Sequence, residues 1–224
     1  MTPTSSVFVH YTVFRRKENR LPLGERFTQA CTEWEQILAA AQPEVQVRGI
    51  YSTVGFRADS DLMLWTISKS PDALQRLTVR LRASELGQGL DMSWAFMGVH
   101  RPAEFAPDHI PAFIKGTPPA RYISVYPFVR REEWYLLPPA ERGRLLREHG
   151  ALGKDFGDVL TNTTQAFGLG DFEWLLAFES DRLERIVDMI RHLRAAEARR
   201  YTKVEIPFIT GIRKPLTEVV ADLA

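Results

Sequence analysis

The chain has 224 residues, of which 45% are hydrophobic, 25% charged and 11% aromatic, a composition typical of ordinary globular proteins. Its 29 Lys and Arg nearly cancel its 28 Asp and Glu, which argues against the strong positive field of a nucleic-acid-binding protein. No stretch approaches the ~20 apolar residues of a transmembrane helix, and the first residues lack the basic and apolar regions of a signal peptide. We therefore expect a cytoplasmic protein whose partners include neither membranes nor nucleic acids.

The N-terminal half predicts a β-α-β-β-α-β order. Residues 7–14 are rich in β-branched and aromatic side chains, which favours a strand. Apolar residues recur at helical spacing over 26–41, and Ser70 and Pro71 are typical of a helix start. The further elements expected are strands over 46–54 and 62–68, a helix over 71–81 and a strand over 91–99. The lone Cys31 lies in the first helix and is expected to be a small packed residue.

The C-terminal half repeats this order after a proline-rich stretch. Five prolines lie between His100 and Pro119, a density that neither a helix nor a central strand tolerates. The elements expected after it are strand 121–129, helix 138–155, strands 159–167 and 172–179, helix 181–198 and strand 201–209. We therefore predict an α+β fold of two fused ferredoxin-like units: an N-terminal half over 1–104, a linker or flap over 105–119, and a C-terminal half over 120–224.

His149 is the first candidate site residue, because of the helix that carries it. Leu145, His149, Leu152 and Phe156 fall on one apolar stripe, which directs the imidazole toward the interior. Gly150 and Gly153 expose backbone beside it and would let a flat macrocycle approach. The residues alone leave open a hydrogen-bonded core histidine or a ligand to a metal or haem.

Two basic clusters are candidate carboxylate sites. On the strand over 121–129, Tyr126 and Arg130 share a face, and a phenol beside a guanidinium suits a bound carboxylate. The alternative is an aromatic core with a solvated charge at the strand end. Arg199 and Arg200 form a second anion site or merely complement the dipole of the preceding helix.

Four motifs occur in an order that resembles the chlorite dismutase superfamily and, within it, the actinobacterial coproheme decarboxylases. They are Tyr126-Pro-Phe-Val-Arg130, Trp134-Tyr135-Leu-Leu-Pro138, Arg147-Glu-His149-Gly-x-x-Gly153 and Gly168-Leu-Gly-Asp-Phe-Glu-Trp174. The resemblance implies a homopentamer that uses hydrogen peroxide to convert two propionates of iron coproporphyrin III (coproheme) to vinyls, giving haem b. It also implies a transient contact with the coproporphyrin ferrochelatase.

The resemblance assigns roles to individual residues. His149 matches the axial iron ligand, Tyr126 the tyrosine whose radical attacks the propionate, and Trp134 the tryptophan near the second propionate. Arg130 occupies a propionate-binding position, and His109 matches the distal histidine. Arg199 and Arg200 are expected to supply further cations for the propionates.

One departure bears on the activity. Chlorite dismutases carry a distal arginine thirteen residues after the axial histidine, where this chain has Asn162 flanked by Thr161 and Thr163. Chlorite decomposition is therefore disfavoured. The alternatives that stay open are a haem carrier, which would not need the phenol of Tyr126, another haem peroxidase of the superfamily, and a non-haem monooxygenase, which would not need His149.

Overall fold

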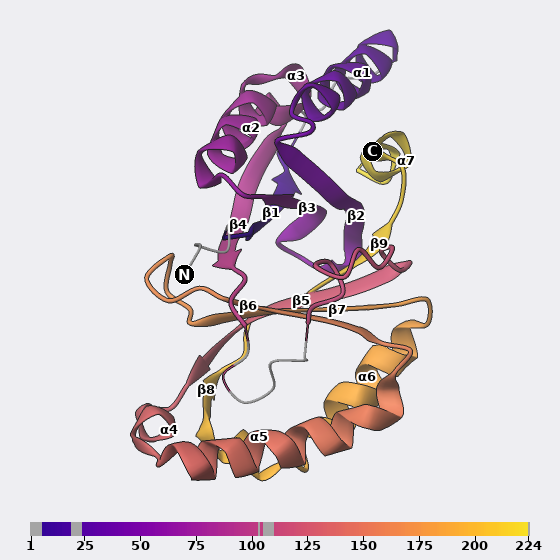
Figure 1. The fold of residues 1–224 in the computed structure, drawn as a ribbon. Helices are drawn as coiled ribbons and strands as arrows, with labels where there is room; N and C mark the ends of the chain where they lie inside the picture. Colours follow the sequence, from indigo (N-terminus) through magenta and orange to yellow (C-terminus); the bar gives the residue numbers. More distant parts are fainter. Residues whose placement is uncertain (1–5, 19–23, 103, 105–109, 224) are drawn as a thin grey trace. The chain divides into compact units, whose positions relative to one another are not determined.

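The structure is a computed structural model, and it describes residues 6–18, 24–102, 104 and 110–223. The chain forms two compact units. Unit 1 comprises residues 1–100 and 209–224, and unit 2 comprises residues 101–208. Each unit combines an antiparallel sheet with helices (Figure 1), as the α+β prediction requires.

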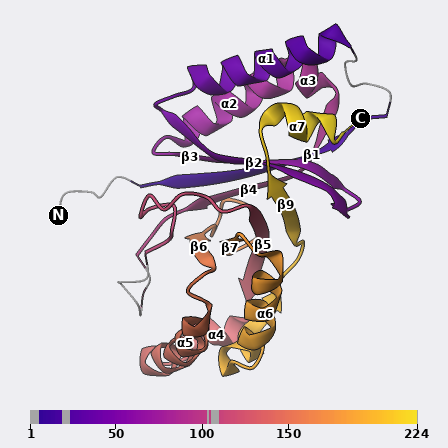
Figure 2. The ribbon, with the colours of Figure 1, turned by 90° about the vertical axis from the view of Figure 1, so that its right-hand side faces the viewer.

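Unit 1 has a five-stranded sheet. Its strands are β1 (Phe8–Arg16), β2 (Val45–Arg57), β3 (Ser60–Ser68), β4 (Leu90–Val99) and β9 (Ile209–Arg213), paired antiparallel in the order β4-β1-β3-β2-β9. Its helices are α1 (Glu25–Ala40), α2 (Pro71–Ala83), α3 (Glu85–Gln88) and α7 (Leu216–Ala221). In Figure 2, α1 and α2 lie side by side on one face of this sheet.

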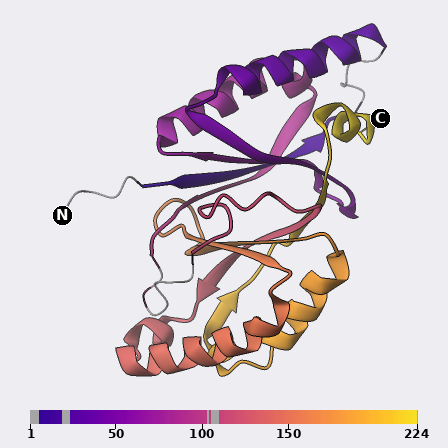
Figure 3. The same cartoon turned by 45° about the vertical axis from the view of Figure 1, so that its right-hand side comes forward.

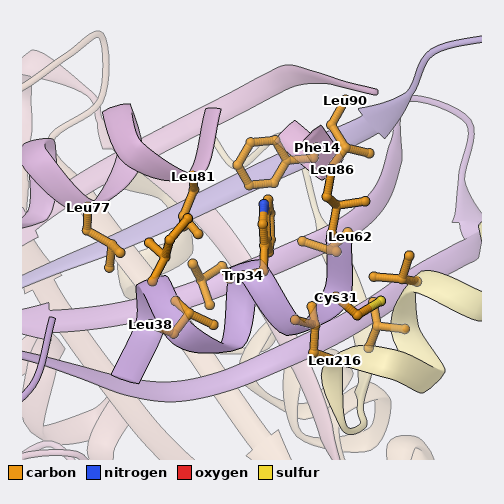
Figure 4. Packing of buried hydrophobic residues seen from close by; sticks show 14 of the residues in the cluster. Phe14, Cys31, Trp34, Leu38, Leu62, Leu77, Leu81, Leu86, Leu90 and Leu216 are labelled. Carbon is orange, nitrogen blue, oxygen red and sulfur yellow. The ribbon is translucent and has the colours of Figure 1, made fainter. Parts of the chain in front are cut away.

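The core of unit 1 lies between this sheet and these helices. Trp34 is fully buried and lies edge-on to Phe14 at 5.8 Å between ring centres (Figure 4). Its indole N–H donates to Ser84 Oγ at 2.7 Å. Cys31 is buried in the same cluster, which confirms its interpretation as a packed residue. Ser70 caps α2 by accepting the backbone N–H of Ala73, also as predicted.

Unit 2 has a four-stranded sheet and the helices that carry the candidate site (Figure 3). Its strands are β5 (Tyr122–Arg130), β6 (Leu160–Gln165), β7 (Trp174–Ser180) and β8 (Thr202–Val204), paired in the order β6-β7-β5-β8. Its helices are α4 (Glu132–Leu136), α5 (Pro139–Gly153) and α6 (Leu183–Leu193), with short 3₁₀ turns η1 (Lys154–Phe156) and η2 (Glu197–Tyr201).

Two predictions in unit 2 were wrong. The helix expected over 181–198 ends at Leu193, because Ala196 is extended and Ala198 packs instead against Trp134 and Leu145. This tertiary packing overrides the helix propensity of the alanines. The strand expected over 201–209 is broken between β8 and β9, where Pro207 has no N–H to donate to a ladder.

The C-terminal segment joins unit 1. Leu216, Val219 and Val220 of α7 lie in the core of that unit, and Lys214 pairs with Asp222 at 2.7 Å. The division of the chain into 1–104, 105–119 and 120–224 stays a prediction, and residues 209–224 group with the first unit by contact. Among the helices of the described residues, none has the length and apolar character to cross a membrane.

Candidate active site

A pocket in unit 2 collects most of the candidate residues. It is lined from the strands β5 and β7 and from the helical segments α5, α6 and η2. Figure 2 shows α5 and α6 on the same side of these strands. Its lining residues are Tyr126, Phe128, Arg130, His149, Leu176, Phe178, Ile190, Leu193, Arg194, Ala198, Arg199, Thr202 and Glu205. The walls are thus apolar, with an imidazole, a phenol and several guanidinium groups.

Tyr126 lies at the strand wall of the pocket. It is 7% exposed, and its ring stacks on Phe208 at 4.4 Å and contacts Phe178 at 5.8 Å between ring centres. Burial and the nearby carboxylate of Glu205 raise the pKa of the Tyr126 phenol well above its ordinary value. The phenol therefore keeps its proton at neutral pH.

Arg130 lines the same pocket from the same strand face, which confirms the alternation predicted from the sequence. Its guanidinium lies over the rings of Phe128 at 4.6 Å and Trp134 at 4.1 Å, and its Nη1 donates to Ala198 O at 3.0 Å. Burial lowers the pKa of Arg130 to about 10, so the group stays charged at neutral pH. A charged, aromatic-flanked guanidinium suits a planar carboxylate.

Trp134 contacts Arg130 from outside the described lining of the pocket. Its side chain is buried in α4, and its ring lies 5.7 Å from that of Tyr201. Among the described residues that line the pocket, Trp134 is absent, but its face contacts the Arg130 guanidinium. The structure therefore places Trp134 as a support for Arg130, and the role at a second propionate stays a prediction.

His149 reaches the pocket from α5 and is half-buried. Leu145 and Phe156 of its stripe are buried, as the helical spacing predicted. A Cβ added at Gly150 or at Gly153 would meet no atom within 4 Å, so both positions border open space. The imidazole is in place to serve as a ligand from one wall of the pocket, and ligation stays a prediction.

The two adjacent arginines of η2 differ in position. Arg199 lines the pocket, and its Nη1 lies 3.0 Å from Glu205 Oε2. Arg200 is exposed, and the described lining of the pocket does not include it. The sequence offered no means to separate them, because adjacent residues of an irregular 3₁₀ turn have no fixed facing.

His109 and Asn162 are the two remaining residues that the sequence singled out. His109 lies outside the described residues. Asn162 is 1% exposed and fully engaged: its Oδ1 accepts the backbone N–H of Phe113 at 3.0 Å, and its Nδ2 donates to Ala177 O and to Glu179 Oε1. In this structure the amide therefore anchors the proline-rich segment.

Arg194 and Glu205 line the pocket and were not predicted. A continuous strand over 201–209 would put Thr202 and Glu205 on opposite faces, but β8 ends at Val204 and both residues line the pocket. Arg194 follows the last residue of α6. Because the helix was expected to continue to residue 198, the place of Arg194 in the pocket was not predicted.

The donor set fits an iron porphyrin with acidic substituents. The imidazole of His149 is a common iron ligand, the apolar walls suit a macrocycle, and Arg130, Arg194 and Arg199 suit carboxylates. The free space is about 100 Å³, less than the ~300–1,000 Å³ of most ligand pockets. A macrocycle would therefore need more space than the pocket holds in this structure.

Fold and pocket together define a class: an α+β protein of two ferredoxin-like units with a histidine- and arginine-lined ligand pocket in the second. A profile of the chlorite dismutase family matches residues 27–214. The match covers most of the sequence, and the chain belongs to the chlorite dismutase family.

Individual relatives and structures are consistent with this assignment. A coproheme decarboxylase from Mycolicibacterium smegmatis is 51% identical over 180 residues, which cover 80% of this chain and 78% of the relative. One from Thermus thermophilus is 29% identical over 169 residues, 70% and 66% of the two chains. A structure of chlorite dismutase from Candidatus Nitrospira defluvii with imidazole has a TM-score of 0.87 at 21% identity, covering 97% of this chain and 94% of that chain. The similarity to this chlorite dismutase structure confirms the fold.

Proposed function

We propose that this protein is a coproheme decarboxylase, which uses hydrogen peroxide to convert two propionates of iron coproporphyrin III to vinyls and releases haem b. The observation that carries the proposal is one pocket lined by His149, Tyr126, Arg130 and Arg199 together. The 51% identity to a relative of that name supports the same reaction.

Binding follows from the chemistry of the lining. His149 would hold the iron from α5, while Arg130 and Arg199 would hold propionates by charge-assisted hydrogen bonds. Arg200 would add a more distant attraction from the surface of η2. Coproheme carries four propionates where haem b has two, so a pocket rich in guanidinium groups binds the substrate more strongly than the product.

Each decarboxylation balances with one peroxide. The propionate, one hydrogen peroxide and one proton give a vinyl group, carbon dioxide and two water molecules. The iron and peroxide supply the oxidising power when bound. The oxidised phenol of Tyr126 takes a hydrogen atom from the propionate, and the loss of a second electron accompanies the release of carbon dioxide.

The surrounding residues position these groups. Phe178 and Phe208 hold the Tyr126 ring, and the Trp134 ring supports the Arg130 guanidinium by direct contact. We assign Trp134 to the second propionate and His109 to proton transfer from peroxide, on the resemblance alone. His109 lies outside the described residues.

The experiment that tests the proposal follows the porphyrin mass after ferric coproheme and then peroxide are added. Two successive losses of formic-acid mass per porphyrin, with haem b as the final product, are expected. Tight binding without any mass loss would instead identify a haem carrier, and oxidation of an added reductant without mass loss would identify another haem peroxidase. Chlorite decomposition is not expected, because Asn162 stands where the chlorite dismutases have arginine.

The assembly and setting of the protein belong to the same proposal. We expect a homopentamer in the cytoplasm that receives coproheme from the coproporphyrin ferrochelatase in a transient contact. Light scattering of the purified protein tests the pentamer, and transfer of coproheme between the two purified proteins tests the contact.

A further inference from the structure

Glu205 brings a carboxylate into the pocket that is expected to bind carboxylates. Its side chain is 17% exposed and forms ion pairs with Arg194 Nη1 and with Arg199 Nη1, the latter at 3.0 Å. All three residues line the pocket. Two of the three guanidinium groups in the described pocket lining are therefore already engaged by an internal acid.

The charge of Glu205 also reaches the β5 wall of the pocket, because β8 pairs with β5 directly before Glu205. It helps to raise the pKa of the Tyr126 phenol, behind burial, and it raises the pKa of Arg130 against the stronger effect of burial. Tyr126, Arg130, Arg194 and Arg199 thus share one nearby negative charge. A propionate placed among these groups would meet the same cations and would be repelled by Glu205.

The ion pairs also join three segments of the chain. Arg194 follows α6, Arg199 lies in η2, and Glu205 follows β8, so the carboxylate links these segments at the edge of a pocket with about 100 Å³ of free space. Entry of a macrocycle needs more room than this. Withdrawal of Glu205 would free the cations and loosen the three segments in one event.

We propose that Glu205 is an internal competitor for the substrate's carboxylates: it occupies Arg194 and Arg199 in the free protein, and coproheme must displace it in order to bind. This role rests on the proposed function. Coproheme offers more propionates than haem b, so it displaces Glu205 more readily. Once two propionates are lost, Glu205 returns to the arginines and favours release of the product.

The test uses iron-free coproporphyrin III, so that no chemistry accompanies binding. Its affinity is measured by quenching of porphyrin fluorescence in the wild type, in Glu205→Gln and in Glu132→Gln. Glu132 is a matched control, because it pairs with Lys203 on the surface of the same unit and is absent from the described pocket lining. Glu205→Gln should bind about ten-fold more tightly, which corresponds to about 1.4 kcal/mol, and Glu132→Gln should bind as the wild type does.

A second variant and a second readout guard against a folding defect. Glu205→Asp keeps the charge on a shorter side chain. Its affinity for coproporphyrin III should be closer to that of the wild type than the affinity of Glu205→Gln is. Phenylglyoxal modification, mapped by mass at Arg194 and Arg199, should be faster in Glu205→Gln than in the wild type or in Glu132→Gln. Both arginines are accessible to the reagent, with side chains 38% and 40% exposed.

The outcomes separate this role from the proposed function. The competitor role is overturned if the wild type binds coproporphyrin III and a folded Glu205→Gln binds it no more tightly. This result leaves the proposed function intact. In that case Glu205 orients the arginines. Failure of both proteins to bind either coproporphyrin III or ferric coproheme overturns the proposed function itself, and the competitor role with it.

Discussion

The phenol of Tyr126 and the imidazole of His149 face one pocket from a strand and a helix, and each is there because of local periodicity. Strand alternation places Tyr126 with Phe128 and Arg130, and the helical repeat places His149 with buried Leu145. At Tyr126 the chemistry can be removed with the ring packing kept, and at His149 a comparison of two porphyrins separates iron ligation from packing. The two residues therefore allow sharp single substitutions.

Tyr126→Phe should separate binding from reaction. The ring contacts with Phe178 and Phe208 remain, but the O–H is lost, so coproheme affinity should change little. Decarboxylation should fall by at least about 10²-fold, as for the loss of a positioned hydrogen donor. Porphyrin mass after peroxide addition measures the effect, and normal haem b formation would show that Tyr126 has no redox role.

His149→Ala should weaken binding of ferric coproheme and change its absorption spectrum, while binding of iron-free coproporphyrin III should change little. A loss of affinity for the ferric porphyrin but not for the iron-free one would identify His149 as an iron ligand. His192→Ala is the control, because His192 is an exposed histidine on α6 whose ring lies 5.6 Å from that of Phe156. Equal weakening for both porphyrins in His149→Ala would instead indicate a packing role.

At the scale of elements, the conformation of the turn η2 determines which of its two arginines lines the pocket. Arg199 lines the pocket and Arg200 does not, although they are adjacent. Ala198 between the helix end and Arg199 is buried and accepts the Arg130 hydrogen bond, which holds the turn in place.

Arg199→Ala should therefore weaken coproporphyrin III binding by roughly ten-fold or more, the loss expected for one charge-assisted hydrogen bond. Arg200→Ala should have a clearly smaller effect, which should also disappear as salt is raised. Titration of both variants at low and high ionic strength checks this. The reverse order of effects would mean that η2 rearranges when the porphyrin binds.

Regular elements were predictable from the sequence, and irregular ones were not. The alternation in β5 correctly put Tyr126 and Arg130 on one face, and the apolar stripe of α5 correctly turned His149 inward. Only the family resemblance had joined the three residues in one site. The predictions failed between Leu193 and Ile209, where the helix stops early and the strand breaks. Arg194 and Glu205 lie in this region, and their positions depend on packing of Ala198 and on Pro207 rather than on any periodic pattern.

At the scale of the whole molecule, the C-terminal segment adds a strand and core residues to unit 1. β9 pairs with β2, α7 adds Leu216 to the core, and the Arg16 guanidinium donates to the backbone carbonyl of Leu223. The sequence predicted two similar halves but no elements after residue 209. A contiguous cut between the halves would separate unit 1 from part of its own core.

The stability of the fold should depend on pH through His10 in β1. His10 is 8% exposed, and burial lowers its pKa to about 4. The unfolded chain binds a proton below pH ~6.5, whereas folded His10 stays neutral until about pH 4. The free energy of unfolding should therefore fall as pH drops through this window, by about 2 kcal/mol at pH 5.

Urea unfolding at pH 7.5 and pH 5 measures this dependence. The difference between the two pH values should be smaller in His10→Leu, which has no proton to bind, and unchanged in His192→Ala. The same pH dependence in His10→Leu and the wild type would assign the effect to other groups.

The hydrogen bonds of Asn162 set a constraint on redesign between activities of this family. A designer who wished to install the distal arginine of the chlorite dismutases would substitute a residue that accepts the Phe113 N–H and contacts buried Glu179. The substitution would leave that N–H without its acceptor, at a cost of about 1–3 kcal/mol if no other group replaces it. Exchange of one activity for the other is therefore a problem of backbone support as well as active-site chemistry, and the segment around Phe113 would have to be redesigned together with residue 162.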